Sequence, residues 1–328
     1  MAPPKRTSST LVTSFMNAIK PLNTKLGIPG ITVEPDSMEG GHHASRGLTG
    51  GPYVNGAGGV GKFATGSSMF LGATSLLGKV AIVTGSGRGT GASIAKCLGE
   101  HGCSVVVNYV TDATSASSVV HHIRSQGKGG AIAVKANTAT IQGGLQLIEE
   151  TIKTFGRVDV VVFNSGVMES STLDGLGEVG EEGEKSWDRA FETNVKVPLW
   201  MCKKVAPMMG PGGRIIFFSS TLTAASTVQP NALCYVATKG AIEQISRVLA
   251  KDLGSRGITV NTISVGPIDT PMFREGKSSH AISSIAKQAP SKRLGEPEDV
   301  APLVAFLASE AARWINGQNL RCDGGYAV

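Results

Sequence analysis

The sequence predicts an α/β fold, a doubly wound parallel sheet of about seven strands in a single domain. Short apolar runs alternate with helical segments from Gly78 to the C-terminus, and a glycine-rich turn directly follows the first run. Aromatic residues make up only 5% of the chain while glycines number 43, which suits short buried strands covered by helices on both faces. Such alternation gives parallel strands joined by right-handed crossovers.

The predicted strands are short apolar runs bounded by turns: Lys79–Thr84, Ser104–Asn108, Ala131–Val134, Val158–Phe163, Arg214–Ser219, Thr259–Ser264 and Asn319–Cys322. Apolar periodicity predicts the helices between them: Ala92–His101, Ala113–Gln126, Gln142–Phe155, Ser186–Met209, Cys234–Leu253 and Pro297–Leu307. Two glycine-containing stretches are predicted as loops, Glu169–Lys185 and Pro271–Pro290.

Residues 1–77 are predicted to be a disordered N-terminal extension, because Gly, Ser, Thr and Pro dominate there. Met1–Val33 carries basic and hydroxyl side chains but no acids, which is typical of an organelle transit peptide; an ordinary tail and a gene-model artefact are the alternatives. Gly56–Lys62 resembles a P-loop, but Phe63 replaces the required hydroxyl and no strand precedes it. His42 and His43 lack further ligands nearby, so no metal site is expected.

Charge and cysteine usage restrict the class of protein. The net charge of +6 is spread along the chain, which does not favour nucleic acid and suits an anionic cofactor. Five scattered cysteines without a C-x-x-C motif favour a reducing compartment. No apolar run approaches the ~20 residues of a membrane span. We therefore expect a cytoplasmic protein, with organelle targeting through the extension as the alternative.

Tyr235 and Lys239 stand four residues apart in a predicted helix, so their side chains share one face. An ammonium beside a phenol favours the phenolate, and the pair predicts a lowered pKa for Tyr235. Proton exchange near neutral pH is what carbonyl chemistry requires. The structural alternative is an amphipathic helix that carries the two residues without a chemical role.

The glycine turn lies between a strand and a helix, the context that a dinucleotide site requires. Bare backbone lets a pyrophosphate approach, and the helix N-terminus offers free N–H groups. The second strand ends at Asn108–Val110 with no acid to hold a ribose 2′-hydroxyl. Arg88 inside the turn suits a 2′-phosphate, although it can also be solvated. Both features favour NADP (NADPH) over NAD.

Six markers follow one another along the chain: Thr84-Gly85-x-x-x-Gly89-x-Gly91, Asn164-Ser165-Gly166, Asn194, Ser219-Ser220, Tyr235-x-x-x-Lys239 and Gly266-Pro267-Ile268-x-Thr270. In this order and spacing they resemble the short-chain dehydrogenase/reductase family from about Gly78 to the C-terminus. The fungal naphthol and versicolorin reductases, which act on aromatic polyketides, look most similar, through Asn108-Tyr109, Lys135-Ala136-Asn137, Asn164-Ser165-Gly166-Val167 and Lys239-Gly240-Ala241-Ile242-Glu243.

The resemblance implies a Rossmann-type catalytic domain at residues 78–328 that reduces a small-molecule ketone with NADPH. Tyr235 would be the general acid and Lys239 would lower its pKa and bind the nicotinamide ribose. Ser220 would bond the substrate oxygen, and Asn194 would hold a water linking Lys239 to solvent. The implied cofactor-binding residues are Gly85, Arg88, Gly89, Thr90, Gly91, Asn108, Asn137, Asn164, Gly166, Tyr235, Lys239, Gly266, Ile268 and Thr270.

Several choices stay open at this point. Thr221 and Ser219 are alternatives to Ser220, because the loop before Tyr235 is longer than usual for the family. Val265 replaces a common Pro, and Phe163 and Ser165 replace the more usual Asn and Ala. Pro271–Pro290 lies where the family keeps its substrate lid, with Met272 and Phe273 as an apolar wall.

A 3-ketoacyl-thioester reductase, an alcohol dehydrogenase and a non-catalytic nucleotide-binding protein are the alternative functions. Family analogy implies a homotetramer or homodimer.

Overall fold

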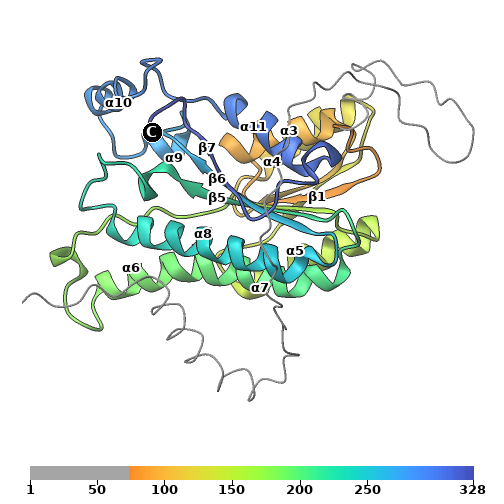
Figure 1. Ribbon diagram of the computed structural model, residues 1–328, viewed down its shortest axis with the longest axis horizontal. Helices are drawn as coiled ribbons and strands as arrows, with labels where there is room; N and C mark the ends of the chain where they lie inside the picture. The colour runs from red at the N-terminus through yellow and green to blue at the C-terminus, as the bar shows by residue number, and fades with distance from the viewer. Residues whose placement is uncertain (1–73) are drawn as a thin grey trace, which may run out of the picture. The chain divides into compact units, whose positions relative to one another are not determined.

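The computed structural model describes residues 74–328, and its centre is one parallel sheet (Figure 1). The strands are β1 (Val80–Val83), β2 (Ser104–Tyr109), β3 (Ala131–Lys135), β4 (Val160–Phe163), β5 (Arg214–Ser220), β6 (Thr259–Val265) and β7 (Asn319–Cys322). They pair in the order β3-β2-β1-β4-β5-β6-β7, all parallel. All seven predicted strands are confirmed. The P-loop-like stretch, the histidine pair and residues 1–73 of the predicted extension 1–77 lie outside the described residues.

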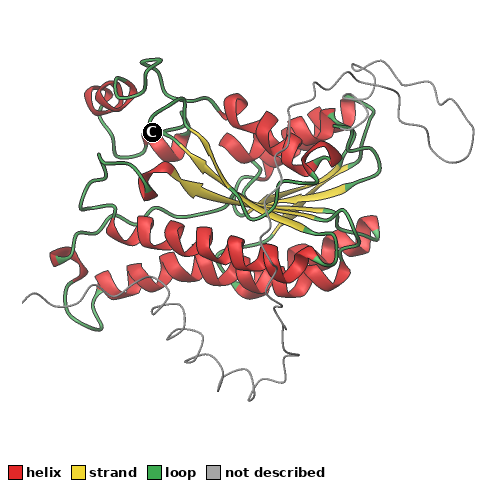
Figure 2. Ribbon diagram, in the orientation of Figure 1, coloured by secondary structure: helices red, strands yellow, loops and turns green. Residues whose placement is uncertain are grey.

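Helices cover both faces of the sheet, as Figure 2 shows. One layer holds α3 (Gly89–Glu100), α4 (Ala113–Ser125) and α11 (Pro297–Ala308); the other holds α5 (Ile141–Phe155), α7 (Val197–Val205) and α8 (Leu233–Gly254). Along β1, Ala81 and Val83 belong to the core under the first layer, while Ile82 belongs to the core under the second. Because side chains alternate across a strand and both faces are buried, each strand is a continuous apolar run.

The predicted helix Ser186–Met209 is present as a continuous helical run, but it begins at Glu182 and is not one regular α-helix. The structure has α6 (Glu182–Phe191), a π-helical turn η2 (Glu192–Lys196), α7, and the 3-10 turn η3 (Ala206–Met208). Pro198 lies at the start of α7 and has no N–H, so the carbonyl of Asn194 cannot receive the α-helical bond from that position. The α pattern is interrupted at this point, and π-turns of this kind are frequent at functional sites.

The two predicted loops also contain helical turns. Glu169–Lys185 includes η1 (Asp174–Leu176) and the beginning of α6. Pro271–Pro290 includes α9 (Pro271–Arg274) and α10 (Ser279–Ala286), and neither has a buried residue. The hydroxyls of Thr270 and Ser278 accept N–H groups of the first turns and cap these helices.

The packed structure begins before Gly78. Leu76 is 1% exposed, joins the core under α3, and donates its N–H to the carbonyl of His101 at 2.9 Å. All five cysteines are free thiols. Among residues 74–328, no helix combines the length and the apolar character needed to cross a membrane.

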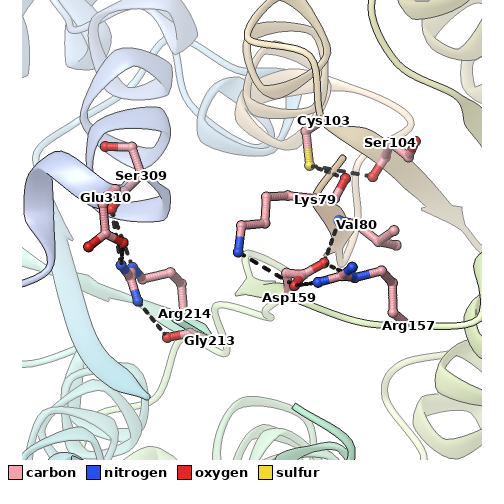
Figure 3. A network of polar contacts seen from close by, with 10 residues as sticks. All are labelled: Lys79, Val80, Cys103, Ser104, Arg157, Asp159, Gly213, Arg214, Ser309 and Glu310. Carbon is pink, nitrogen blue, oxygen red and sulfur yellow. Dashed lines mark hydrogen bonds and ion pairs between the residues drawn. The ribbon is translucent and has the colours of Figure 1, made fainter. Parts of the chain in front are cut away.

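A charged network closes the sheet at the amino ends of β1 and β4 (Figure 3). The Asp159 carboxylate, whose side chain is 9% exposed, accepts two bonds from Arg157 at 2.8 and 2.7 Å and one from the Val80 N–H at 2.9 Å. Lys79 adds an ion pair at 3.7 Å. This end of the sheet is therefore held by charge, whereas the carboxyl ends of the strands carry the loops described below.

Replacing Asp159 with Ala should lower the free energy of unfolding by about 2–3 kcal/mol, because the buried Val80 N–H loses its acceptor and two cations lose their partner. Urea unfolding measures the change. Glu149, an exposed acid on α5, is the matched control, and its replacement by Ala should cost less than about 0.5 kcal/mol. Equal effects for the two variants would contradict the role given to Asp159.

Candidate active site

Lys239 and Tyr235 lie side by side on α8, at the carboxyl ends of the strands. The Lys239 side chain is buried, and its Nζ donates a hydrogen bond of 2.8 Å to the Phe218 carbonyl of β5. The same Nζ lies 5.5 Å from the centroid of the Tyr235 ring. The predicted pairing of phenol and amine on one helix face is present, and it is anchored to the sheet.

Burial controls the protonation of both groups. Although part of Tyr235 remains exposed, loss of water around its phenol raises the pKa to about 12, and the neighbouring Ser220 hydroxyl opposes the rise. Burial lowers the pKa of Lys239 to about 8. The predicted lowering of the Tyr235 pKa is therefore wrong here, because burial raises it. At neutral pH the phenol keeps its proton and is available as a donor.

Of the three candidate hydroxyls after Phe218, Ser220 is the one beside the phenol. It lies close enough to Tyr235 to lower the pKa of the phenol, and its Oγ accepts the Leu222 N–H at 3.3 Å. The Thr221 hydroxyl instead donates to the Val265 carbonyl at 3.3 Å. Ser219 donates to Glu243 at 2.7 Å.

Asn194 lies in the π-turn η2 and joins the loop after β4 to α8. Its Oδ1 accepts the Val167 N–H at 2.9 Å, and its Nδ2 donates to the Val167 carbonyl at 2.9 Å and to Thr238 Oγ1 at 3.0 Å. The side chain therefore fixes this loop against the helix that carries Tyr235. The water that we expect at Asn194 stays a prediction.

The glycine turn is shaped by contacts that only glycine permits. Gly85 and Gly89 have φ angles of 62° and 55°, in the left-handed region. A Cβ on Gly91 would lie 2.4 Å from the Gly85 carbonyl oxygen and 2.6 Å from Asn164 Nδ2. Arg88 occupies the N-cap of α3 without a side-chain capping bond. The first N–H groups of α3, including that of Thr90, thus have no side-chain acceptor at the cap and suit an anion.

Two asparagines support this turn from within. Asn108 is completely buried; its Oδ1 accepts the Gly85 N–H at 2.9 Å and its Nδ2 donates to the Ala136 carbonyl at 2.9 Å. Asn164 Nδ2 donates to the Thr84 carbonyl at 3.0 Å. We interpret Asn108 as a residue that shapes the turn rather than one that touches a ligand, because it has no exposed surface.

The segment Asn164–Gly166 connects the glycine turn to the Tyr235–Lys239 pair. A Cβ on Gly85 would lie 2.7 Å from Ser165 Oγ. A Cβ on Gly166 would lie 3.5 Å from Lys239 Nζ and 3.1 Å from Asn194 Oδ1. The turn after β1 and the pair on α8 thus lie at the same end of the sheet, the carboxyl end of its strands.

Comparison with known proteins agrees with this geometry. A family model described as Enoyl-(Acyl carrier protein) reductase matches residues 85–327. The short chain dehydrogenase/reductase AacuN of Aspergillus aculeatus is 39% identical over 264 residues, which are 77% of this chain and 97% of that protein. The chain belongs to the short-chain dehydrogenase/reductase family. It is therefore an oxidoreductase with the Rossmann-type sheet of this family.

Other members of the family are similar over nearly their whole length. A probable tetrahydroxynaphthalene reductase of Zymoseptoria tritici is 37% identical over 75% of this chain and 94% of its own. The solved structure of the angucycline C-6 ketoreductase LanV with bound NADP superposes with a TM-score of 0.69 at 35% identity, over 77% of this chain and 96% of that one.

The remaining predicted cofactor residues of this short-chain dehydrogenase/reductase come from the neighbouring strand ends. Thr270, after β6, lies against the glycine turn, because a Cβ on Gly89 would come within 3.5 Å of its Cγ2. Ile268 is buried, and the backbone at Gly266 packs against Asp323. Asn137, after β3, is exposed and accepts the Ala139 N–H at 3.1 Å.

One structural residue was absent from the predicted site. The Thr84 hydroxyl accepts the N–H groups of Asn164 and Ser165 at 3.0 and 2.9 Å, and so holds the connecting segment against β1. Its position directly before Gly85 in the motif was the available signal, but a strand-end threonine has many possible partners.

Replacing Gly91 with Ala should disrupt the turn, because its Cβ would overlap the Gly85 carbonyl. We expect a loss of about 2–4 kcal/mol in stability or a more than tenfold weaker affinity for NADPH, measured by urea unfolding and fluorescence titration. Gly240 on α8 is the matched control, since a Cβ there meets nothing within 4 Å. A Gly91→Ala variant as stable and as tight as Gly240→Ala would contradict this account of the turn.

Proposed function

We propose that this protein is an NADPH-dependent ketoreductase that reduces a cyclic or aromatic ketone to an alcohol, with Tyr235 as the proton donor. The observation that carries the proposal is that Ser220, the Tyr235 phenol and Lys239 lie together at the carboxyl end of the sheet, where the glycine turn also lies. We infer that residues 78–328 form the catalytic domain.

The residues of the chain fit a bound dinucleotide. The first turn of α3 presents N–H groups for the pyrophosphate, next to backbone that only glycine can form. Lys239 Nζ uses one of its protons on the Phe218 carbonyl, which leaves donors for ribose hydroxyls. When bound, NADPH supplies the hydride that adds to the carbonyl carbon of the substrate.

Tyr235 and Ser220 act on the other atom of the carbonyl group. A phenol with a pKa near 12 is protonated at neutral pH, so Tyr235 can give its proton to the substrate oxygen as negative charge develops there. Ser220 donates a hydrogen bond to the same oxygen, and the two hydroxyls stabilise the developing oxyanion. The product is the alcohol, and the phenolate is reprotonated from solvent, for which we propose the water held near Asn194.

Arg88 favours the phosphorylated cofactor. Its side chain is exposed at the glycine turn. The nearest acid after β2, Asp112, has its carboxylate bound to the Ser115 N–H and hydroxyl, which lower its pKa, and Arg88 adds a smaller electrostatic effect in the same direction. The carboxylate is thus committed to capping α4, and the guanidinium nearby suits a 2′-phosphate. NADP in the LanV structure supports the same choice.

The names of two relatives support the proposed substrate class. Both the probable tetrahydroxynaphthalene reductase and the angucycline ketoreductase are named for polycyclic aromatic substrates. A 3-ketoacyl-thioester reductase is the second candidate, because the matching family model is described by a reaction on acyl carrier protein.

We also propose a homodimer or homotetramer in the cytoplasm. Trp200 on α7 and Val248 on α8 are 42% and 63% exposed, although both are large and apolar. An apolar pair of helices on the surface suits contact with a second copy.

Purified protein should oxidise NADPH with cyclic and aromatic ketones, and NADH at least about tenfold less efficiently, since NADH offers Arg88 no phosphate.

Tyr235→Phe keeps the ring but removes the donated proton, so it should lower kcat by about 100-fold or more while NADPH affinity stays near normal. Stopped-flow absorbance and fluorescence titration measure the two quantities.

A fully active Tyr235→Phe variant would refute the assigned proton donor. Turnover of a carrier-bound 3-ketoacyl thioester with none of any cyclic ketone would select the second candidate.

The catalytic efficiency with NADPH, kcat/KM, should depend on the charge of Lys239. Its pKa is lowered from the usual range to about 8, so the ammonium is present below pH 8 and lost above it. We expect kcat/KM for NADPH, which reports ionisations of the free enzyme, to fall about tenfold per pH unit above this value. The phosphates of NADPH are fully ionised by then and do not produce this decrease. A constant kcat/KM up to pH 10 would contradict the assignment.

A further inference from the structure

Glu243 is a third polar side chain on the sheet-facing side of α8. It follows Tyr235 by eight residues and Lys239 by four, so the three side chains succeed one another turn by turn. Its Oε1 accepts hydrogen bonds from Ser219 Oγ at 2.7 Å and from Thr223 Oγ1 at 2.8 Å. Ser264 Oγ of β6 lies 3.3 Å away. One carboxylate oxygen of Glu243 thus contacts three hydroxyls, which come from the ends of the neighbouring strands β5 and β6.

The two short bonds come from residues on either side of Ser220. Ser219 precedes it in β5, and Thr223 ends the 3-10 turn η4 (Thr221–Thr223) that follows it. The Ser219 proton points to the carboxylate rather than to the Lys239 carbonyl, because the distances are 2.7 and 3.5 Å. Thr223 Oγ1 lies 2.8 Å from Glu243 Oε1 and 2.9 Å from the Ser220 carbonyl, so its one proton is shared between these two acceptors.

The carboxylate depends on these hydroxyls. Glu243 is only partly exposed, and no ion pair among residues 74–328 includes it. Hydrogen bonds to an ionised acceptor are about twice as strong as neutral ones. The ends of the segment that carries Ser220 are therefore fixed to the same helix that carries Tyr235.

We propose that Glu243 is a positioning residue: it holds Ser220 beside the Tyr235 phenol by clamping Ser219 and Thr223. Its kinetic consequences rest on the proposed ketoreductase function. Glu243 does not touch the reacting atoms, and its effect on turnover passes through Ser220. Ser264 donates to Asn319 at 2.7 Å and contributes less to the clamp.

A double-mutant cycle tests the proposal. Glu243→Leu should lower kcat by about 10- to 100-fold through displacement of Ser220, with KM for ketone and affinity for NADPH changed by less than about threefold. Ser220→Ala should lower kcat by about 100-fold. The double variant should be no slower than Ser220→Ala within about twofold, because Glu243 has nothing left to position.

Two further variants separate positioning from folding. Glu243→Gln keeps an acceptor oxygen and should recover most of the activity lost in Glu243→Leu. Asp252→Leu removes an exposed carboxylate from the same helix and should leave kcat unchanged. Thermal unfolding confirms that each variant is folded at the assay temperature. Losses that multiply in the Glu243→Leu/Ser220→Ala variant would overturn the proposal and leave Glu243 a purely structural role.

A structural readout keeps this test independent of the proposed function. Compared with a wild-type crystal structure, one of Glu243→Leu should show Ser220 Oγ moved away from the Tyr235 hydroxyl, while Glu243→Gln retains the wild-type contact. An unchanged contact in Glu243→Leu overturns the proposal. Absence of turnover by the wild-type protein on every ketone would instead refute the ketoreductase function, and the two crystal structures would still decide the role of Glu243.

Discussion

The hydrogen bond from Lys239 Nζ to the Phe218 carbonyl fixes the geometry on which the site depends. It joins the second turn of α8 to the end of β5 at 2.8 Å, inside a buried environment. Because α8 is a rigid helix of 22 residues, this single attachment determines what lies one turn before and one turn after it. Tyr235 comes beside Ser220, and Glu243 comes beside Ser219 and Thr223. A shift of α8 along the sheet would separate all three contacts together.

The two ends of the sheet carry different kinds of polar groups. At the amino ends, Asp159 collects Lys79, Arg157 and a backbone N–H, and Arg214 donates to the Ser309 and Gly213 carbonyls (Figure 3). These charged contacts stabilise the amino ends of the strands. At the carboxyl ends, the loops leave an ammonium with spare donors, a protonated phenol and uncapped helical N–H groups. Groups of this kind suit an anionic cofactor and a carbonyl oxygen, which is the arrangement that open parallel sheets commonly use for ligands.

The fold could be predicted because strands that are buried on both faces are continuous apolar runs in the sequence. Each strand is an apolar run, and Gly85, Gly89 and Gly91 mark the turn where a side chain would collide with the backbone. Tyr235 and Lys239 were placed together by helical periodicity alone. Ser220 could not be separated from Ser219 and Thr221, because three adjacent hydroxyls look alike until the strand direction and the loop are known.

Other features depended on tertiary contacts that periodicity does not report. The π-helical turn at Asn194 follows from the missing N–H of Pro198, yet a proline near a helix start usually leaves the hydrogen bonds of the helix intact. The predicted loop Pro271–Pro290 contains α9 and α10, which the hydroxyls of Thr270 and Ser278 cap. The direction of the Tyr235 pKa shift was wrong because sequence spacing gives the neighbouring charge but not the desolvation. Asn108 looked like a ligand contact and is instead buried beneath the turn.

The central claim is that the glycine turn and the Tyr235–Lys239 pair serve one bound dinucleotide, and a crystal structure of the complex with NADP tests it most directly. The account predicts the pyrophosphate against the first N–H groups of α3, a ribose hydroxyl within hydrogen-bonding distance of Lys239 Nζ, and the nicotinamide ring next to the Tyr235 hydroxyl. A dinucleotide bound elsewhere, or one whose nicotinamide lies away from Tyr235 and Lys239, would contradict it.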